Sequence, residues 1–422
     1  MKITKNLSGL SKNEIRSTYF SNMKPILNDR AMFADATEEY RSPEEPSAGD
    51  TVKLKFRTAK YNVDRVEVVV NGIAYSMKKF MTNTNFDYYI AEFTLGAQRT
   101  EYYFHALVGR TSIYYNQAGP YRELNPTYNF VINPGFKTPD WAKGAVIYQI
   151  YVDRFHNGDK SNDVVDNEYV YIGEPVHRIT DWNEYPATMD VRNFYGGDLQ
   201  GVLDKMDYLE SLGIDAIYFN PLFVSPSNHK YDIQDYDYID PHFGRIVSDE
   251  GELLFHDQRE NRFASRYIDR VTNKANLEAS NALFAELVAE AHKRGIRVIL
   301  DGVFNHCGSF NKWMDRERIY ENAEGYEKGA YIEKESPYHS YFKFHNDNAW
   351  PYNGSWLGHD TLPKLNYEDS RELYAYILRI AAKWVAPPYN ADGWRLDVAA
   401  DLGYSPETNH RFWKDFRRAV RE

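Results

Sequence analysis

Residues 203–222, LDKMDYLESLGIDAIYFNPL, place a helix directly before a strand. Apolar side chains recur at the spacing of one helix face, at Leu203, Met206, Leu209 and Leu212. Gly213 is a typical helix end, and the apolar run at 216–222 is typical of a strand that is buried on both faces. The stretch therefore predicts a helix that leads into a central strand of a parallel sheet.

The same unit occurs twice more along the chain. Helical spacing precedes Gly295 and the apolar run at 297–304, and it precedes a further strand at 393–398. A first strand is predicted at 146–152, so the pattern is a parallel α/β series. Such a series fits an open doubly wound sheet or a (β/α)₈ barrel. Because no glycine-rich phosphate-binding fingerprint follows the first strand, we favour the barrel, with about its first half present.

The N-terminal part of the chain has a different period. Residues 25–133 contain short β-branched and aromatic runs separated by turns such as Asn71-Gly72, which predict a β-sandwich after an N-terminal extension at 1–24. The predicted strands are 52–56, 65–70, 88–95, 102–108 and 112–115.

The rest of the chain divides at the predicted third strand. Residues 134–304 form the first part of the barrel, and 367–422 continue it through the fourth strand and its helix. Between them, residues 305–366 are aromatic and irregular, too long for a simple connection, and predict a small inserted domain.

Composition excludes several classes of function. The net charge is −11 without a basic stripe, which argues against nucleic acid as a partner. No apolar stretch is long enough to span a membrane, and no secretory signal is visible, so we expect a cytoplasmic protein. The single cysteine, Cys307, excludes an internal disulfide. The 35 Tyr and 8 Trp residues suit flat, hydroxylated sugar rings.

Polar residues follow the predicted strands at the carboxyl ends, where a barrel places its reacting groups. They are His229-Lys-Tyr-Asp232, Asp301-Gly-Val-Phe-Asn-His306 and Gly393-Trp-Arg-Leu-Asp-Val-Ala399. Arg395 and Asp397 lie two residues apart on a strand, so their side chains face the same side. The pair is either an activated nucleophile with its arginine or a structural ion pair. Asp301, Asn305 and His306 are either catalytic or strand-end caps.

A second cluster follows the first strand. Asn157, Asp159, Asn162 and Asp163 place four short oxygen-bearing side chains in one loop. Hard cations such as Ca²⁺ need such ligands, although an ordinary Asx-rich turn has the same composition.

Several runs together resemble the α-amylase superfamily of glycoside hydrolases. They are FYGGDLQGV at 194–202, HKYDIQDYDYIDPHFG at 229–244, DGVFNH at 301–306 and GWRLDVA at 393–399. LPKLN at 362–366 resembles the signature of the branch that contains neopullulanase, cyclomaltodextrinase and maltogenic amylase. The resemblance extends from about Arg41 onward, and the β-domain resembles the starch-binding-type domain of that branch.

This resemblance implies a retaining hydrolase of α-1,4-glucosidic bonds in maltodextrins, cyclodextrins, starch or pullulan. Asp397 would form the covalent glycosyl-enzyme and Arg395 would keep it ionised. Tyr231 would stack under the sugar ring, His306 would bind its hydroxyl groups, and Asp301 would support the site.

The resemblance also implies Ca²⁺ at the loop of Asn157, Asp159, Asn162 and Asp163, together with a backbone oxygen of Gly196 and with Asp198. Asn305 matches a calcium ligand of some other amylases. The branch further implies a homodimer formed through the N-terminal domain. Trp350, Tyr352 and Trp356 either line sugar subsites or form the core of the inserted domain.

The general acid is the missing part of the resemblance. In the family it is a Glu at the end of the fifth strand, and no Glu of this chain occupies a matching position. We therefore expect the 422 residues to be a piece of a longer enzyme. Two alternatives stay open: a glucanotransferase or branching enzyme of the same superfamily, and a catalytically inert α-glucan-binding protein.

Overall fold

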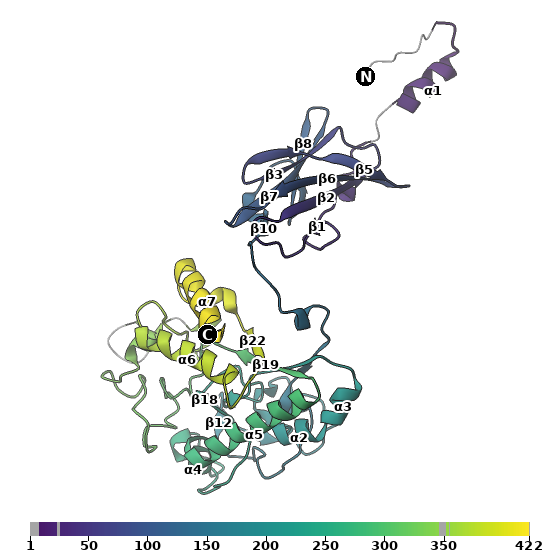
Figure 1. Cartoon of the computed structure of the whole chain (residues 1–422). Coiled ribbons are helices and arrows are strands. Elements are labelled where there is room, and N and C mark those ends of the chain that lie inside the picture. Colours follow the sequence, from purple (N-terminus) through teal and green to yellow (C-terminus); the bar gives the residue numbers. More distant parts are fainter. Residues whose placement is uncertain (1–7, 23–25, 346–351, 354, 422) are drawn as a thin grey trace. The chain divides into compact units, whose positions relative to one another are not determined.

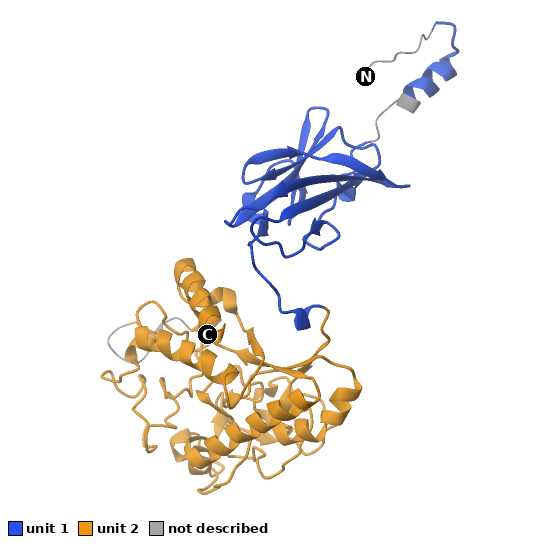
Figure 2. Ribbon diagram, viewed as in Figure 1, with its two compact units in different colours: residues 1–143 blue, residues 144–422 orange. Residues whose placement is uncertain are grey.

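The computed structural model describes residues 8–22, 26–345, 352–353 and 355–421. The chain forms two compact units, residues 1–143 and 144–422 (Figure 2). The first unit extends past residue 133, where the sequence pattern changes, because contacts to Glu45 hold the residues that follow. Thr138 donates its backbone N–H to Glu45 at 2.8 Å, and Lys143 forms an ion pair with the same carboxylate at 3.0 Å.

Two antiparallel sheets make up the first unit (Figure 1). One sheet has the order β1 (Arg41–Ser42), β2 (Thr51–Ala59), β6 (Phe86–Thr94) and β5 (Lys78–Thr82). The other has the order β4 (Ile73–Ser76), β3 (Arg65–Val70), β7 (Thr100–Val108), β8 (Thr111–Asn116) and β9 (Gly119–Tyr121), with β10 (Phe130–Ile132) paired to β7. Helix α1 (Lys12–Asn22) precedes the sheets.

Alternating side chains from both sheets form the core of this unit. Val52, Leu54 and Phe56 of β2 are fully buried, and Phe56 stacks on Phe104 of β7 with 4.7 Å between the ring centres. The five predicted strands correspond to β2, β3, β6, β7 and β8. The predicted turn at Asn71-Gly72 joins β3 to β4 with φ angles of 46° and 82°, the left-handed values that a tight hairpin turn needs.

A four-stranded parallel sheet is the centre of the second unit. Its strands follow chain order: β11 (Ile147–Ile150), β16 (Ala216–Phe219), β19 (Arg297–Gly302) and β22 (Gly393–Leu396). All four lie inside the strands predicted from the sequence. The inner strands β16 and β19 are largely buried, whereas the outer strands β11 and β22 are more exposed.

Helices connect and cover these strands (Figure 1). They are α2 (Leu199–Asp204), α3 (Met206–Ser211), α4 (Ser265–Thr272), α5 (Lys274–Lys293), α6 (Arg371–Val385) and α7 (Pro406–Arg421). Phe284, Leu287 and Val288 bury one face of α5, and Leu373, Ile377 and Ile380 bury one face of α6. The single helix predicted across 203–212 was wrong in one respect: it is two short helices, because the backbone leaves helical geometry at Lys205 (φ −103°, ψ 10°).

Residues 305–366 belong to the second unit, and those of them that the structure describes contain little regular structure. The described elements are η7 (His339–Tyr341), β20 (Lys343–Phe344), β21 (Tyr352–Asn353) and η8 (Trp356–Gly358). Trp313 and Tyr352 are buried in the same apolar cluster as the parallel strands, so this segment shares the core of the sheet. Trp350 lies outside the described residues. Among the described helices, none is long and apolar enough to cross a membrane.

Candidate active site

Three predicted site residues meet at the carboxyl ends of β19 and β22. Asp301 of β19 is the register partner of Arg395 of β22, so the two side chains start from neighbouring backbone positions. Arg395 Nη1 lies 3.0 Å from Asp301 Oδ1 and 2.7 Å from Asp397 Oδ1. One guanidinium group therefore contacts both carboxylates.

Asp301 is the buried member of this group, with 1% of its surface exposed. Its Oδ2 accepts hydrogen bonds from the hydroxyl groups of Tyr218 and, at 2.9 Å, Tyr231. Burial raises the pKa of Asp301, while the bonds from Tyr218 and Arg395 act in the opposite direction. Both carboxylate oxygens of Asp301 accept from protein donors, so this residue holds Arg395, Tyr218 and Tyr231 together and organises the site.

Asp397 is more accessible, with 16% of its side chain exposed. Its backbone N–H donates to Gly302 O at 3.0 Å, which continues the sheet to this residue. The chain then turns at Val398, whose φ of 41° is costly for a β-branched residue. The strained turn ends the strand directly after Asp397 and leaves its carboxylate at the open end of the sheet.

Tyr231 reaches Asp301 from the loop between β17 (Phe223–Val224) and β18 (Asp235–Ile239). Its backbone N–H donates to His229 Nδ1 at 3.1 Å, and the preceding residue, Lys230, has a left-handed φ of 59°. Burial raises the pKa of the Tyr231 hydroxyl to about 12, so it stays a hydrogen-bond donor to Asp301 at neutral pH.

His306 follows β19 and is 1% exposed. Burial lowers its pKa to about 4, so the imidazole is neutral at pH 7. Asn305 Nδ2 lies 3.3 Å from His306 Nδ1, and an amide there donates, which leaves the proton on Nε2. Buried Nε2 has no well-formed hydrogen bond within the protein, and buried Asn305 Oδ1 has none either. Such unsatisfied atoms are expected where a ligand hydroxyl group completes the bonding.

Two residues of the site were not assigned from the sequence. Tyr218 of β16 bonds Asp301, and the only signal was a polar-tipped aromatic in an otherwise apolar strand. The Trp356 ring stacks on His306 with 5.0 Å between ring centres and 7° between the planes. Its Nε1 also donates to Asp401 Oδ2 at 3.2 Å. Trp356 thus joins the site, whereas Tyr352 is buried in the core.

The predicted calcium loop is assembled around Asp198. This carboxylate caps α2 by accepting from Gly201 N at 2.6 Å, and it also accepts the backbone N–H of Asp159 at 2.8 Å. Asn157 Nδ2 donates to Asp163 Oδ1 at 2.7 Å, and Arg178 pairs with the same carboxylate. Burial raises the pKa of Asp163 to about 6 even though Arg178 opposes this shift.

The loop passes two structural tests for a hard cation. Asn157 Oδ1 and Asn162 Oδ1 are buried without a hydrogen-bond donor, so two amide oxygens are available as ligands. A Cβ atom at Gly196 would lie 2.4 Å from Asp163 Oδ1, and Gly196 has a φ of 82°, so only glycine brings this backbone so close. Within the described part of the chain, no group of three or more His, Cys, Asp or Glu residues could hold a metal by itself.

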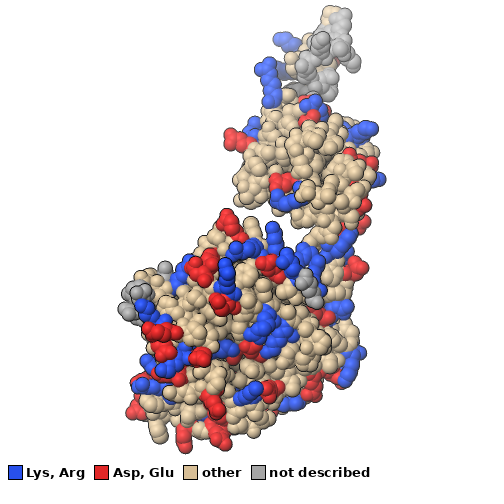
Figure 3. Space-filling model, turned by 60° about the vertical axis from the view of Figure 1, so that its left-hand side comes forward, with Lys and Arg blue, Asp and Glu red and all other residues tan. Residues whose placement is uncertain are grey.

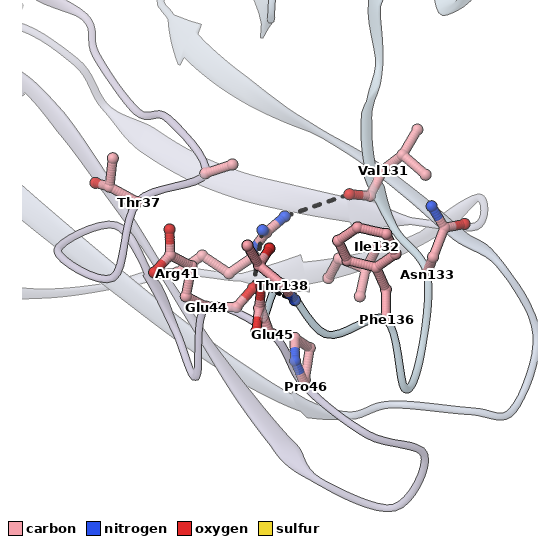
Figure 4. A pocket seen from close by; sticks show the side chains of 11 residues that line it. Thr37, Arg41, Glu44, Glu45, Pro46, Val131, Ile132, Asn133, Phe136 and Thr138 are labelled. Carbon is pink, nitrogen blue, oxygen red and sulfur yellow. Dashed lines mark hydrogen bonds between the residues drawn. The ribbon is translucent and has the colours of Figure 1, made fainter. Parts of the chain in front are cut away.

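A separate cavity of about 410 Å³ lies in the first unit (Figure 4). It lies between the 37–46 and 131–138 segments. Arg41 donates to Val131 O at 3.3 Å and to Glu44 O at 2.9 Å, and Glu45 pairs with Lys143. Arg41 and Glu45 at the border of this cavity are therefore already engaged by the protein.

The surface of the second unit carries both charge signs. On the face drawn in Figure 3, Lys and Arg alternate with Asp and Glu rather than forming a field of one sign. The arrangement at the strand ends is therefore local: two carboxylates on one arginine, an aromatic hydroxyl pair and a neutral histidine.

Comparison with protein families decides the relationship. Residues 149–277 and 279–421 match the model of the alpha amylase catalytic domain, and residues 45–133 match that of the alpha amylase N-terminal Ig-like domain. The chain belongs to the alpha-amylase family. The prediction from the five sequence runs is thereby confirmed at the family level.

Individual members of the alpha-amylase family are similar over most of the chain. A cyclomaltodextrinase of Thermoanaerobacter pseudethanolicus is 35% identical over 89% of this chain and 57% of its own length. An intracellular maltogenic amylase of Bacillus subtilis is 32% identical over 88% of this chain and 55% of its own length. A solved cyclomaltodextrinase structure has a TM-score of 0.56 at 29% identity and covers 93% of this chain and 58% of its own. The chain thus spans little more than half of these relatives.

Proposed function

We propose that this alpha-amylase family member is a retaining glycoside hydrolase that cleaves α-1,4-glucosidic bonds in maltodextrins, cyclodextrins, starch or pullulan, with Asp397 as nucleophile. The observation that carries the proposal is the pair of contacts from Arg395 to Asp301 and Asp397, at 3.0 and 2.7 Å. They hold a partly exposed carboxylate beside a buried one at the strand ends, where a covalent mechanism needs a positioned nucleophile.

In this mechanism, Asp397 attacks the anomeric carbon and the glycosidic C–O bond breaks. Arg395 holds the attacking carboxylate in position, and Asp301 holds Arg395 and Tyr231 in place. Neutral His306 donates from Nε2 to a sugar hydroxyl group. Water then hydrolyses the glycosyl-enzyme and restores Asp397.

A second carboxyl group, about 5 Å from the nucleophile, must protonate the leaving oxygen. Asp301 does not fit this role, because Arg395, Tyr218 and Tyr231 all donate to its carboxylate, which acts as an acceptor in each contact. We assign no other residue of this chain as the acid. That the acid lies outside the 422 residues stays a prediction.

The substrate class rests on similarity. The names of the relatives refer to cyclomaltodextrin and to maltose formation, which supports an α-glucan substrate here. The loop at 402–408 follows the nucleophile strand, and loops in this place shape substrate choice. Homodimerisation through the N-terminal domain and a cytoplasmic location are further proposals.

Calcium is proposed as a structural ion. Asn157, Asn162 and Gly196 would supply neutral oxygens, and Asp159, Asp163 and Asp198 would supply charge. The ion would offset the repulsion that Asp198 and Asp153 exert on Asp163. It would thereby fix the loop that follows β11.

The test uses α-maltosyl fluoride, because fluoride leaves without protonation and the assay needs no general acid. We expect the 422-residue chain to release fluoride and Asp397→Asn to release none above background. A sugar-binding chain that releases no fluoride would favour the inert α-glucan-binding alternative. Maltoheptaose turnover by the same chain would contradict the prediction that the acid lies elsewhere.

A labelled acceptor separates hydrolysis from transfer. The favoured hydrolase gives maltose and products shorter than the substrate. A glucanotransferase or branching enzyme gives labelled products longer than the acceptor, and this outcome would replace the hydrolase proposal.

A further inference from the structure

A row of buried charged side chains, called the charge row below, lies beneath the loop that carries Tyr231. Its members alternate in sign and are almost completely buried, apart from Asp249 at the outer end: Lys230, Asp240, His242, Glu168, Arg270 and Asp249. The residues come from four separate parts of the sequence, which are the loop at 168, the 230–242 segment, the loop at 249 and helix α4.

Both ring nitrogens of His242 face carboxylates. Nδ1 lies 2.8 Å from Asp240 Oδ1, and Nε2 lies 2.7 Å from Glu168 Oε1. A neutral imidazole has one nitrogen with a bare lone pair, which would repel the carboxylate that it meets. Two acceptors at these distances require two N–H donors, so the geometry assigns an imidazolium to His242.

The other charged and titratable groups around His242 fit this assignment. Tyr267 of α4 stacks on the ring with 5.9 Å between centres, and it lies beside Arg270, which donates to Glu168 Oε2 at 2.9 Å. Lys230 Nζ lies 2.7 Å from Asp240 Oδ2. Asp249, at the outer end, is contacted by Arg266 as well as by Arg270. Glu168 and Asp240 each meet His242 and one other cation, which is Arg270 for Glu168 and Lys230 for Asp240. Without the His242 proton, the two buried carboxylates lose the cation that they share, and a bare ring lone pair faces one of them, which is costly. Burial lowers the pKa of His242, but Glu168 and Asp240 outweigh burial and raise it.

Asp240 transmits this arrangement to the active-site loop. Its Oδ2 accepts from Ser225 N at 3.0 Å as well as from Lys230 Nζ, so one carboxylate binds both ends of the 225–230 turn. Lys230 also donates to Ser225 O at 2.9 Å, and its backbone has the left-handed φ of 59°. Tyr231 is the next residue, and its hydroxyl bonds Asp301 at 2.9 Å.

We propose that His242 is a positioning residue: its buried imidazolium holds Asp240, which locks the turn at Lys230 and so presents Tyr231 to Asp301 and to the bound sugar. The inference rests on the proposed function, because that function gives Tyr231 a sugar ring to contact. His242 itself touches neither the sugar nor Asp397.

The first test is hydrogen exchange over residues 225–232 at pH 7 in the wild-type chain, His242→Gln and the control His292→Gln. His292 lies in the same unit and pairs with Asp392 at 2.8 Å, but its side chain is 37% exposed. We expect exchange in the loop to be about tenfold faster in His242→Gln, with a cooperative melt retained, and unchanged in the control. A loop that exchanges at the wild-type rate in His242→Gln would overturn the proposal.

A second measurement needs no variant and therefore does not depend on whether His242→Gln folds. In the wild-type chain labelled with ¹⁵N-histidine, we expect both His242 nitrogens to carry protons at pH 7.5. A neutral ring at that pH would contradict the proposal.

The third measurement separates positioning from general destabilisation. Maltoheptaose affinity is compared for Tyr231→Phe, His242→Gln and the double variant. If His242 acts through Tyr231, the loss of binding free energy in the double variant is smaller than the sum of the two single losses. Independent effects would give the full sum. Additive losses overturn the proposal. Failure of the wild-type chain to bind maltoheptaose contradicts the proposed function instead, and the exchange result still decides the positioning.

Discussion

Two clusters of charged side chains lie in the second unit, and they differ in how their polar atoms are satisfied. In the charge row between Lys230 and Arg270, both carboxylates, Asp240 and Glu168, face cations at hydrogen-bond distance and are shielded from water. At the strand ends, Asp397 is partly exposed, and the neighbouring His306 and Asn305 retain unsatisfied atoms. The first cluster is complete as it stands and supports the fold. The second needs a ligand to be complete, which is typical of a reacting site.

The largest expected effect separates the two clusters by activity. Asp397→Asn removes the nucleophile, so turnover of α-maltosyl fluoride should fall at least about 10,000-fold, or about 5.4 kcal/mol in activation free energy. Because Asp397 is partly exposed, the free energy of unfolding should change little. The matched control is Asp207→Asn, whose carboxylate is 91% exposed and pairs with Arg294. A large loss of stability in Asp397→Asn would show that Asp397 supports the fold, as the charge row does.

In the charge row we expect a loss of folding stability. Lys230→Met leaves Asp240 buried with one cation fewer, and removing one partner of a buried pair costs about 3–5 kcal/mol. Urea unfolding of Lys230→Met and of the exposed control Lys274→Met measures this cost. Lys274 pairs with Glu278 at 3.6 Å on the surface. Equal free energies of unfolding for the two variants would show that the charge row does not stabilise the fold.

The two buried histidines should respond to pH with opposite signs. Burial lowers the pKa of His306 to about 4, so between about pH 4 and 6.5 only the unfolded chain binds this proton, and stability rises with pH by up to about 3 kcal/mol. The pKa of His242 is raised, so its contribution is present below pH 6.5 and is lost as pH rises through its folded value.

Stability curves of His306→Gln and His242→Gln across pH 4–9 measure both effects. The first variant should flatten the acid side of the curve, and the second should flatten the neutral to alkaline side. The same change on the same side in both variants would refute the distinction between the two clusters.

Calcium gives the smallest expected effect. At a calcium concentration of 100 times the dissociation constant, binding to the folded loop adds about 2.7 kcal/mol to stability. Melting with calcium and with chelator measures this difference. Gly196→Ala should abolish the calcium-dependent part, because a Cβ atom there would lie 2.4 Å from Asp163 Oδ1. An equal calcium effect in that variant would exclude this loop as the site.

Local pattern predicted much of the fold. The strands β3, β16 and β19 were found because each alternates or is apolar throughout and ends at a turn residue. The edge strand β5 was missed because all five of its residues are exposed, so burial leaves no period in its sequence. The break at Lys205 was missed because the apolar spacing continues across it.

The site was predictable where it is local in sequence. Arg395 and Asp397 are two residues apart on one strand, and their contact follows from strand geometry. The charge row through Glu168, His242 and Arg270 leaves no local pattern in the sequence, because only the folded loops bring these residues together. The same reason hides the contact between Tyr218 and Asp301, which depends on the register of neighbouring strands.

The most direct test of the central claim is to locate the covalent intermediate. An α-maltosyl fluoride with a second fluorine at C5 forms the glycosyl-enzyme without a general acid and slows its hydrolysis. Peptide mass spectrometry then identifies the labelled residue. We expect maltosyl mass on the peptide that contains Asp397 and none in Asp397→Asn. Label on another carboxylate, or a sugar-binding chain that acquires no label, would contradict Asp397 as the nucleophile.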